Sequence, residues 1–153
     1  RLGIAPFRLH SARLRLSPSL TSYREDFFQT LSVSMWAQGG ELIYAGPIED
    51  EALADGLRKL SATFGVGVTS FGLTPEVLDD LPRPANILNA HPKETEAIMA
   101  KLDVHRISAV QSRPHLDWSA LGSMRSESAE AEKLVAWLKG CVDRRRAEPF
   151  KDE

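Results

Sequence analysis

The chain has 153 residues, of which 42% are hydrophobic and 26% are charged, close to the averages of soluble globular proteins. This length is enough for one domain with a hydrophobic core, and the composition excludes disorder along the whole chain. The formal net charge of −2 excludes a surface that is basic throughout, so any nucleic-acid site would have to be local.

Cysteine usage and hydropathy limit the setting of the protein. Cys141 is the single cysteine of the sequence, so no internal disulfide can form. No apolar run approaches the roughly 18 to 20 residues needed to span a bilayer. We therefore expect a cytoplasmic protein without a membrane partner. Because the sequence starts at Arg1 without a methionine, we also expect a fragment that lacks its N-terminal part.

The first half of the chain alternates between strand and helix patterns. A bulge near Ser11 would bring the two apolar phases of the first strand together, and Gly39-Gly40 and Gly65 would end the two helices. Strands are expected over residues 7–16, 42–45 and 66–71, and helices over residues 21–38 and 49–64. This order predicts crossover units and a sheet that is at least partly parallel, hence an α/β fold.

The pattern weakens after Leu73. Prolines bracket acidic residues there and predict a surface loop. Further elements are expected over residues 94–102 (helical), 107–110 (strand) and 126–142 (helix). We expect one domain over residues 1–143 and a flexible tail over residues 144–153.

Most familiar catalytic patterns do not occur in the sequence. It contains no P-loop and no dinucleotide-binding glycine fingerprint, since the glycines at 65 and 67 begin a strand and do not join a strand to a helix. The histidines are scattered without ligand spacing, so no metal-binding residues are predicted. They are His10, His91, His105 and His115.

Two segments resemble a known family. The run YREDFFQTLSVSMWA at residues 23–37 and the run RPHLDW at residues 113–118 are similar to segments of restriction-endonuclease-like (PD-(D/E)xK) proteins associated with an N-terminal HARE-type helix-turn-helix domain. The similarity continues through residues 42–45, 57–61 and 64–68 and is weakest over residues 73–106. It implies a mixed sheet flanked by helices and a helix-turn-helix domain upstream.

The resemblance also implies where the catalytic motif would lie. In the family, a Glu-Leu-Lys precedes the helix; its glutamate holds Mg²⁺ together with an aspartate, while its lysine activates water. The matching positions here read Arg13-Leu14-Arg15, and a guanidinium cannot ligate a cation. Gln29 matches the family's helix glutamine. Arg13, Arg15 and Gln29 are therefore the motif positions, in a degenerate form; no cofactor is expected unless the nuclease is active, in which case it is Mg²⁺.

Three functions remain open at this stage. Alternate residues of a strand share one side, so Arg13 and Arg15, extended by Arg8, could bind DNA phosphates or simply coat an exposed strand. The first function is a nuclease-fold domain that acts in DNA binding or assembly within a restriction or defence-type protein, with a homodimer by analogy. The second is an active Mg²⁺-dependent DNA endonuclease whose carboxylates lie upstream or have moved to Glu25 or Asp26. The third is a protein-interaction domain without a nucleic-acid role.

Overall fold

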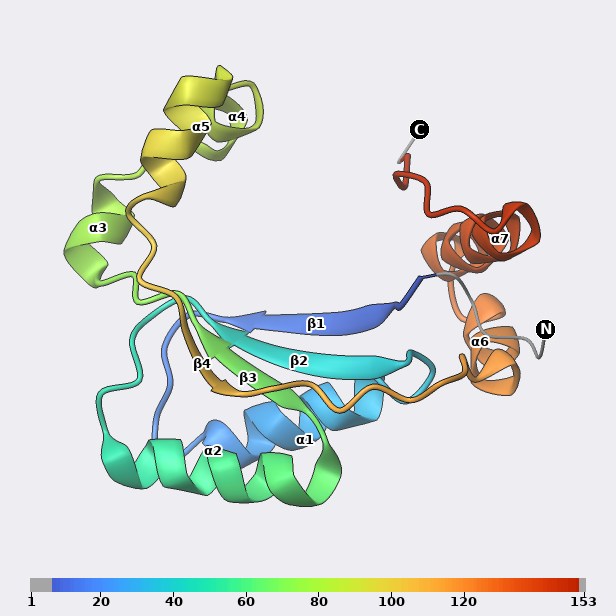
Figure 1. Cartoon of the computed structure of the whole chain (residues 1–153), viewed down its shortest axis with the longest axis horizontal. Helices are drawn as coiled ribbons and strands as arrows, with labels where there is room; N and C mark the ends of the chain where they lie inside the picture. The colour runs from blue at the N-terminus through green and yellow to red at the C-terminus, as the bar shows by residue number, and fades with distance from the viewer. Residues whose placement is uncertain (1–6, 152–153) are drawn as a thin grey trace.

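A four-stranded mixed sheet forms the centre of the computed structural model, which describes residues 7–151. Its strands lie in chain order, β1-β2-β3-β4, as Figure 1 shows. β1, β2 and β3 are parallel, whereas β4 runs antiparallel to β3. Their bounds are β1 His10–Arg15, β2 Gly39–Tyr44, β3 Gly67–Ser70 and β4 His105–Ser108. The expected α/β class and partly parallel sheet are confirmed.

Two crossover helices cover one face of the sheet (Figure 1). α1 (Tyr23–Val33) connects β1 to β2, and α2 (Glu51–Phe64) connects β2 to β3. The Asp50 side chain caps α2 by accepting the backbone N–H groups of Ala52 and Leu53, groups that have no partner inside a helix. Gly65 ends α2 in the left-handed conformation with φ 77°, which glycine adopts without strain.

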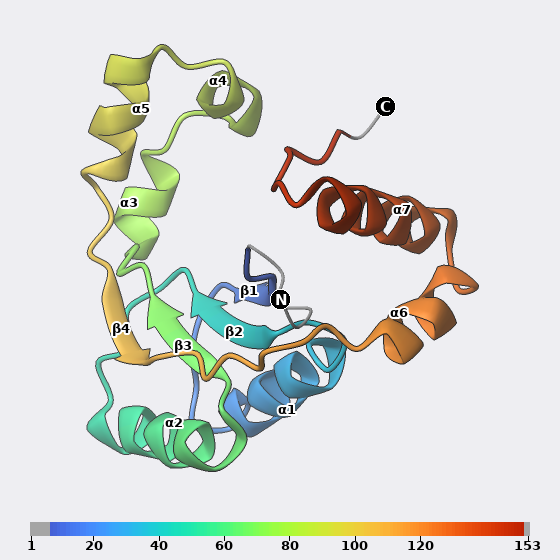
Figure 2. The ribbon, with the colours of Figure 1, turned by 45° about the vertical axis from the view of Figure 1, so that its right-hand side comes forward.

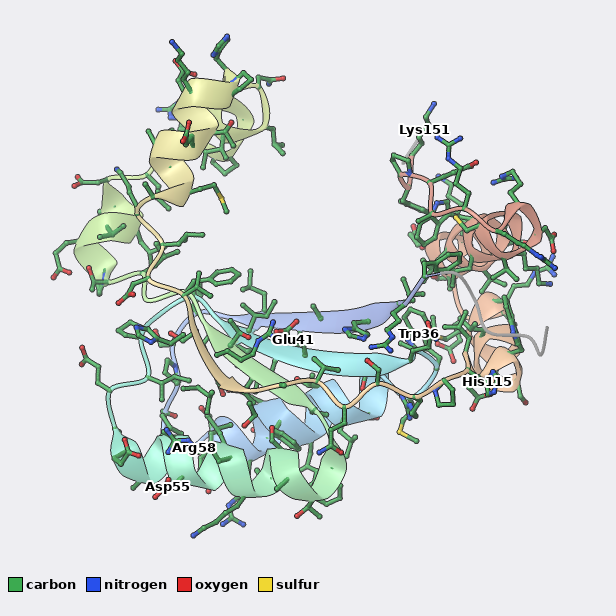
Figure 3. All side chains as sticks on the ribbon, viewed as in Figure 1. Trp36, Glu41, Asp55, Arg58, His115 and Lys151 are labelled. Atoms are coloured by element: carbon green, nitrogen blue, oxygen red, sulfur yellow. The ribbon has the colours of Figure 1, made fainter. Side chains whose placement is uncertain are left out.

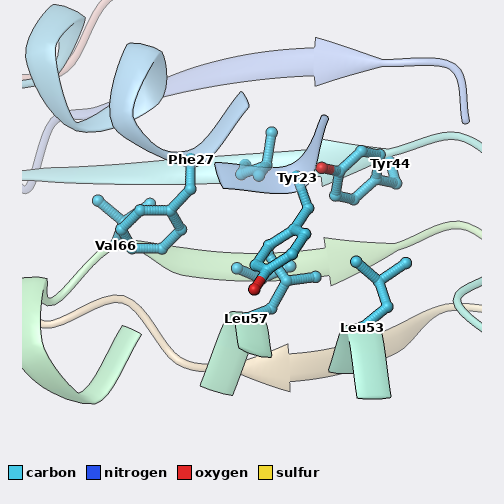
Figure 4. Packing of buried hydrophobic residues seen from close by; sticks show 8 residues of the cluster. Tyr23, Phe27, Tyr44, Leu53, Leu57 and Val66 are labelled. Carbon is cyan, nitrogen blue, oxygen red and sulfur yellow. The ribbon is translucent and has the colours of Figure 1, made fainter. Parts of the chain in front are cut away.

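The main hydrophobic core lies between this face of the sheet and the two helices (Figure 4). Alternate residues of each strand point into it, so β2 contributes Leu42 and Tyr44 while β3 contributes Val68. The helices contribute apolar stripes that complete the cluster. The buried members are Tyr23, Phe27, Leu42, Tyr44, Leu53, Leu57, Val66 and Val68.

The chain between β3 and β4 forms an arm, which we define as residues 74–104. It contains α3 (Pro75–Asp79), α4 (Pro84–Leu88) and α5 (Pro92–Met99), each with proline in its first turn. Proline suits this position because its missing N–H would have no partner there. No residue between 74 and 115 is buried. The arm extends from one end of the sheet, on the side away from α1 and α2 (Figures 1 and 2).

Two C-terminal helices stand at the other end of the sheet (Figure 2). α6 (Trp118–Arg125) and α7 (Ala129–Arg144) enclose a second cluster with Leu116, Leu121, Val135 and Leu138, against which Leu9 and Trp36 pack. Beyond α7, the Trp137 indole donates a hydrogen bond to the Glu148 carbonyl over 3.0 Å. Within residues 7–151, no helix is long and apolar enough to cross a membrane.

Several element boundaries differ from those expected. α1 ends at Val33 and not near residue 38, and Gly39-Gly40 begins β2 instead of following the helix. Glycine suits position 40 of β2, because a Cβ there would collide with the Ser34 hydroxyl at the end of α1. The register from His10 to Arg15 against β2 is continuous, so the expected bulge near Ser11 is wrong.

The second half of the chain contains more helix than expected. α3 and α4 occupy the stretch that was expected to be a loop, and α6 was not expected at all. These helices are short, at 5, 5 and 8 residues, so they present too few turns to establish a helical period in the sequence.

Candidate functional site

Arg13 and Arg15 lie on the side of β1 that faces α1. In the parallel register, Arg13 is the partner of Leu42 and Arg15 is the partner of Tyr44, both of which are core residues. Laterally paired residues point to the same face of a sheet. The prediction that the two arginines point the same way is confirmed, and the face they share is the one covered by helices.

Arg15 joins a polar cluster with Asp26 and Tyr44, which we call the Asp26 cluster. Asp26 and Tyr44 are buried, whereas the Arg15 side chain is 45% exposed. Asp26 comes from the first turn of α1 and is only 2% exposed. Its Oδ1 lies 2.9 Å from Arg15 Nε, and its Oδ2 accepts a hydrogen bond from the Tyr44 hydroxyl over 2.9 Å. A buried carboxylate needs such partners, because taking an isolated charge out of water is costly.

The Asp26 cluster also affects the ionisation of Tyr44. Burial raises the pKa of the Tyr44 phenol far above its ordinary value of 10.0, and the hydrogen bond to Asp26 raises it further. The phenol donates to a carboxylate in its neutral form, so losing its proton would place two negative charges side by side. Tyr44 is therefore a neutral donor that holds Asp26 in place.

Arg13 is less well satisfied than Arg15. Its Nε is buried and has no hydrogen-bond partner among the described residues. Gln29, the third position matching the family motif, is half-buried and donates to Glu25 Oε1 over 3.2 Å. Arg8 is exposed and precedes β1. The structure thus brings Arg15 to Asp26, but no hydrogen bond in the described part of the chain joins Gln29 to either arginine.

The residues at the Glu-x-Lys positions do not suit Mg²⁺. This ion is held by carboxylate and other oxygen ligands in an octahedral arrangement, whereas β1 offers two guanidinium groups. Asp26 does reach β1 from the following helix, but Arg15 and Tyr44 occupy both of its oxygens. Among residues 7–151, no group of three or more His, Cys, Asp or Glu residues could hold a metal ion.

The second family-like segment, residues 113–118, has a structural role. Arg113 Nη2 donates to the carbonyls of Ser34 and Ala37, each over 2.8 Å. A cation at this position neutralises the negative end of α1 and satisfies carbonyls that have no partner in the helix. Asp117 caps α6 by accepting the Ala120 N–H. The two segments that carry the resemblance are therefore in direct contact.

Gln38 links the same segment to β1, and sequence analysis did not single it out. Its Oε1 accepts the Leu9 N–H over 2.9 Å, and its Nε2 donates to the Pro114 carbonyl over 3.1 Å. Gln38 is 2% exposed, so a buried amide with both ends bonded fixes the entry to β1 against residues 113–118. Its position between a helix and two glycines gave no signal in the sequence.

The other face of the sheet carries a smaller polar group. Figure 3 shows Glu41 on the face away from α1 and α2, whereas Asp55 and Arg58 lie on α2. Glu41 Oε1 accepts a hydrogen bond from the Thr69 hydroxyl over 2.7 Å. No helix of the described residues covers this face (Figures 1 and 2). Thr69 is nevertheless buried and Glu41 half-buried, so the pair stabilises the junction of β2 and β3.

The fold and site define an α/β domain with a four-stranded mixed sheet flanked by helices, and a buried aspartate clamped by an arginine and a tyrosine. Neither a scan against protein-family models nor searches of curated proteins and of solved structures gave a match for this chain.

Proposed function

We propose that this chain is a restriction-endonuclease-like module that has lost metal-dependent cleavage and binds the DNA backbone within a restriction or defence-type protein. Support comes from the order β1, α1, β2, α2, β3 with parallel pairing, and from the positions of Arg13 and Arg15 on the α1 side of β1. This is the place where the family-like motif would present its glutamate and lysine.

The observation that carries the proposal is the state of Asp26. It is the carboxylate that lies against Arg15 on β1, and both of its oxygens accept bonds, from Arg15 and from Tyr44. A divalent cation at Asp26 would have to displace the Arg15 guanidinium, whose Nε lies 2.9 Å from Asp26 Oδ1. It would also lie on the same side of β1 as Arg13. Repulsion between these cations opposes metal binding, which favours a binding role over hydrolysis.

Arg8, Arg13 and Arg15 differ in how freely they could contact DNA. Asp26 neutralises Arg15, whose side chain is 45% exposed, so the groups left for phosphate are the half-buried Arg13 and the exposed Arg8. Guanidinium groups hold phosphate oxygens bidentately. A site with about two phosphate contacts would bind weakly, and its affinity would fall with salt concentration with a log–log slope of about −2.

A cleavage and retention experiment tests the proposal. Plasmid and single-stranded DNA are incubated with the protein in Mg²⁺, Mn²⁺ or EDTA, and duplex retention is measured across a salt series. We expect no cleavage, retention at low salt, and weaker retention for Arg13→Glu. Lys59→Glu, an exposed change of equal charge on α2, is the matched control and should weaken retention less.

The opposite results are equally informative. Cleavage that requires a metal and is lost in Asp26→Asn would contradict the proposal and establish the active endonuclease with a displaced carboxylate. If Arg13→Glu and Lys59→Glu lost retention equally, DNA would be attracted by the overall charge of the protein and not by a site at Arg13.

A protein-interaction domain without a nucleic-acid role is the second candidate. The arm favours it, because no residue of 74–104 is buried and three of its apolar side chains, Leu88, Met99 and Val104, are 85%, 58% and 56% exposed. Exposed apolar side chains of this kind can be covered by contact with another protein. Absence of DNA retention at low salt would favour this candidate.

A further inference from the structure

β1 is an outer strand of the sheet, and one of its edges is free in the described part of the chain. It pairs with β2 alone. The carbonyls of Leu9 and Arg15 accept hydrogen bonds from Gln38 and Ala45, so odd-numbered residues direct their backbone groups toward β2. Since these groups alternate along a strand, the N–H and C=O groups of His10, Ala12 and Leu14 lie on the free edge.

The side chains along this edge have a distinct chemistry. Residues 7–22 contain three arginines and one histidine but no Asp or Glu, in a chain whose net charge is −2. Leu14 and Leu16 are 63% and 69% exposed. Arg13 and Arg15 project to the α1 side, while Ala12 and Leu14, the partners of Glu41 and Ile43, project to the uncovered face. One side of the edge thus carries Arg13 and the Asp26-paired Arg15, and the other carries His10, Ala12 and Leu14.

A second copy of β1 would not complete this edge well. Antiparallel pairing about a two-fold axis places residues of one side opposite residues of the same side. The registers centred on residue 13 or residue 14 put Arg13 opposite another Arg13 or opposite Arg15. Like charges directly across a strand pair are destabilising, whereas opposite charges stabilise it. The registers centred on residue 11 or 12 avoid this repulsion, but they place Arg13 opposite Leu9 or Ser11. Pairing of two copies thus gives Arg13 no anionic partner, whereas an acidic segment of another protein does.

We propose that the free edge of β1 accepts an extended segment of another protein as an additional strand. Its alternating pattern is acidic on the side of Arg13 and Arg15 and apolar on the side of Ala12 and Leu14. Backbone hydrogen bonds to His10, Ala12 and Leu14 hold the segment, and the alternating side chains select it. Arg13, which forms no ion pair among the described residues and whose Nε is buried without a partner, gains an anionic neighbour for its guanidinium. This inference does not depend on DNA binding.

Two blocked heptapeptides probe the edge, one with the core Glu-Val-Glu-Val-Glu and the other with the core Lys-Val-Lys-Val-Lys. Binding is followed by chemical-shift changes and amide hydrogen exchange on the whole chain. We expect the Glu peptide to bind several-fold more tightly, because the cross-strand pair at Arg13 changes from repulsive to attractive, while Asp26 already neutralises Arg15. The amides of His10, Ala12 and Leu14 should exchange more slowly when it is bound.

Two variants separate edge pairing from general charge attraction. Ala12→Pro removes one free-edge N–H, which an outer strand tolerates, and should abolish protection while the core amides of Leu42 and Val68 stay protected. Arg13→Glu should reverse the preference between the two peptides. A Glu peptide that is N-methylated on the residues facing away from β1 should bind like the parent, and one methylated on the facing residues should not.

Some results would overturn the edge proposal. Equal affinity for the two peptides, or protection of amides other than those three, would do so. The edge proposal would also fail if duplex DNA slowed exchange at the three amides and the Glu peptide did not. That result would support the DNA proposal. Peptide binding without DNA retention would support the edge inference and contradict the proposed function.

Discussion

The sheet with α1 and α2 differs from the arm in how its helices are stabilised. In the sheet unit, Phe27, Leu57 and Tyr44 are fully buried, so helix and strand support each other by packing. In the arm, no residue is buried, and side chains cap the start of α5: Glu94 Oε2 accepts the His91 N–H, and His91 Nδ1 accepts the Lys93 N–H. Local capping thus produces helical turns without a core, and it adds little to global stability.

Hydrogen exchange should show the largest difference between these regions. The amides of Leu42 and Val68 should open only with global unfolding, at a cost on the order of 5 to 15 kcal/mol. Those of Ile98 and Met99 in α5 should exchange by local opening at a small fraction of that cost. Residue-resolved exchange at neutral pH measures both. Equal protection in the arm and the sheet would contradict the comparison.

A matched pair of apolar truncations should differ by several kcal/mol. Phe27→Ala empties a site in the centre of the core and should lower the free energy of unfolding by about 3 to 5 kcal/mol. Leu88→Ala, at a side chain that is 85% exposed, should change it by about 0.5 kcal/mol or less. Urea denaturation followed by circular dichroism gives both values. A large loss in Leu88→Ala would indicate that the arm packs against something in solution.

Tyr44→Phe should alter both stability and its dependence on pH. Loss of the hydrogen bond to Asp26 should cost about 1 kcal/mol or somewhat more at neutral pH. Because the pKa of Tyr44 is raised above 10.0 in the folded state, its contribution to the free energy of unfolding is fully present below pH 10. It is lost as the pH rises through the folded-state pKa.

The pH effect is measured by urea titrations between pH 7 and pH 11. The wild type should lose stability above pH 10 more steeply than Tyr44→Phe, since the phenylalanine has no proton to release. Parallel curves for the two proteins would mean that Asp26 and Tyr44 are not bonded in solution.

Removing helix caps should change the free energy of unfolding least. The change should again be larger in the sheet unit than in the arm. Asp50→Ala deletes the cap of α2, whose stripe enters the core, and should cost about 1 kcal/mol of global stability. Thr74→Ala deletes the cap of α3, where Thr74 accepts the Val77 N–H over 3.4 Å, and should cost only a few tenths. Thermal unfolding of the two variants compares them. A larger loss from Thr74→Ala would reverse the ranking.

The spacing of apolar residues in the sequence predicted the fold in the regions where those residues form the buried faces of helices and strands. The α/β class, the partly parallel sheet and the helix ended by Gly65 could all be predicted from the sequence, because apolar residues recur there at the spacing of buried faces. The placement of Gly40 in β2 could not, since it reflects the close approach of Ser34 at the end of α1. The short helices of the arm were missed because capping and proline placement, and not apolar spacing, determine them.

The candidate site was predicted in part. The shared side of Arg13 and Arg15 followed from strand alternation, and Asp26 was among the carboxylates considered for a reach toward β1. Its two bonds, to Arg15 and Tyr44, join residues 11 and 18 positions away, and no local pattern encodes them. The contact of Arg113 with the end of α1 spans more than 70 positions and can be seen only in three dimensions.

The base of the arm has a consequence for how the domain could vary. The Asp103 N–H donates to the Phe71 carbonyl over 2.9 Å, and β3 and β4 are antiparallel neighbours. In topological terms, the arm is an insertion at the tip of a hairpin. Loop-closure entropy rises only slowly with length, so lengthening, shortening or replacing the arm leaves the pairing of the sheet intact and makes the arm the part of this chain freest to diverge.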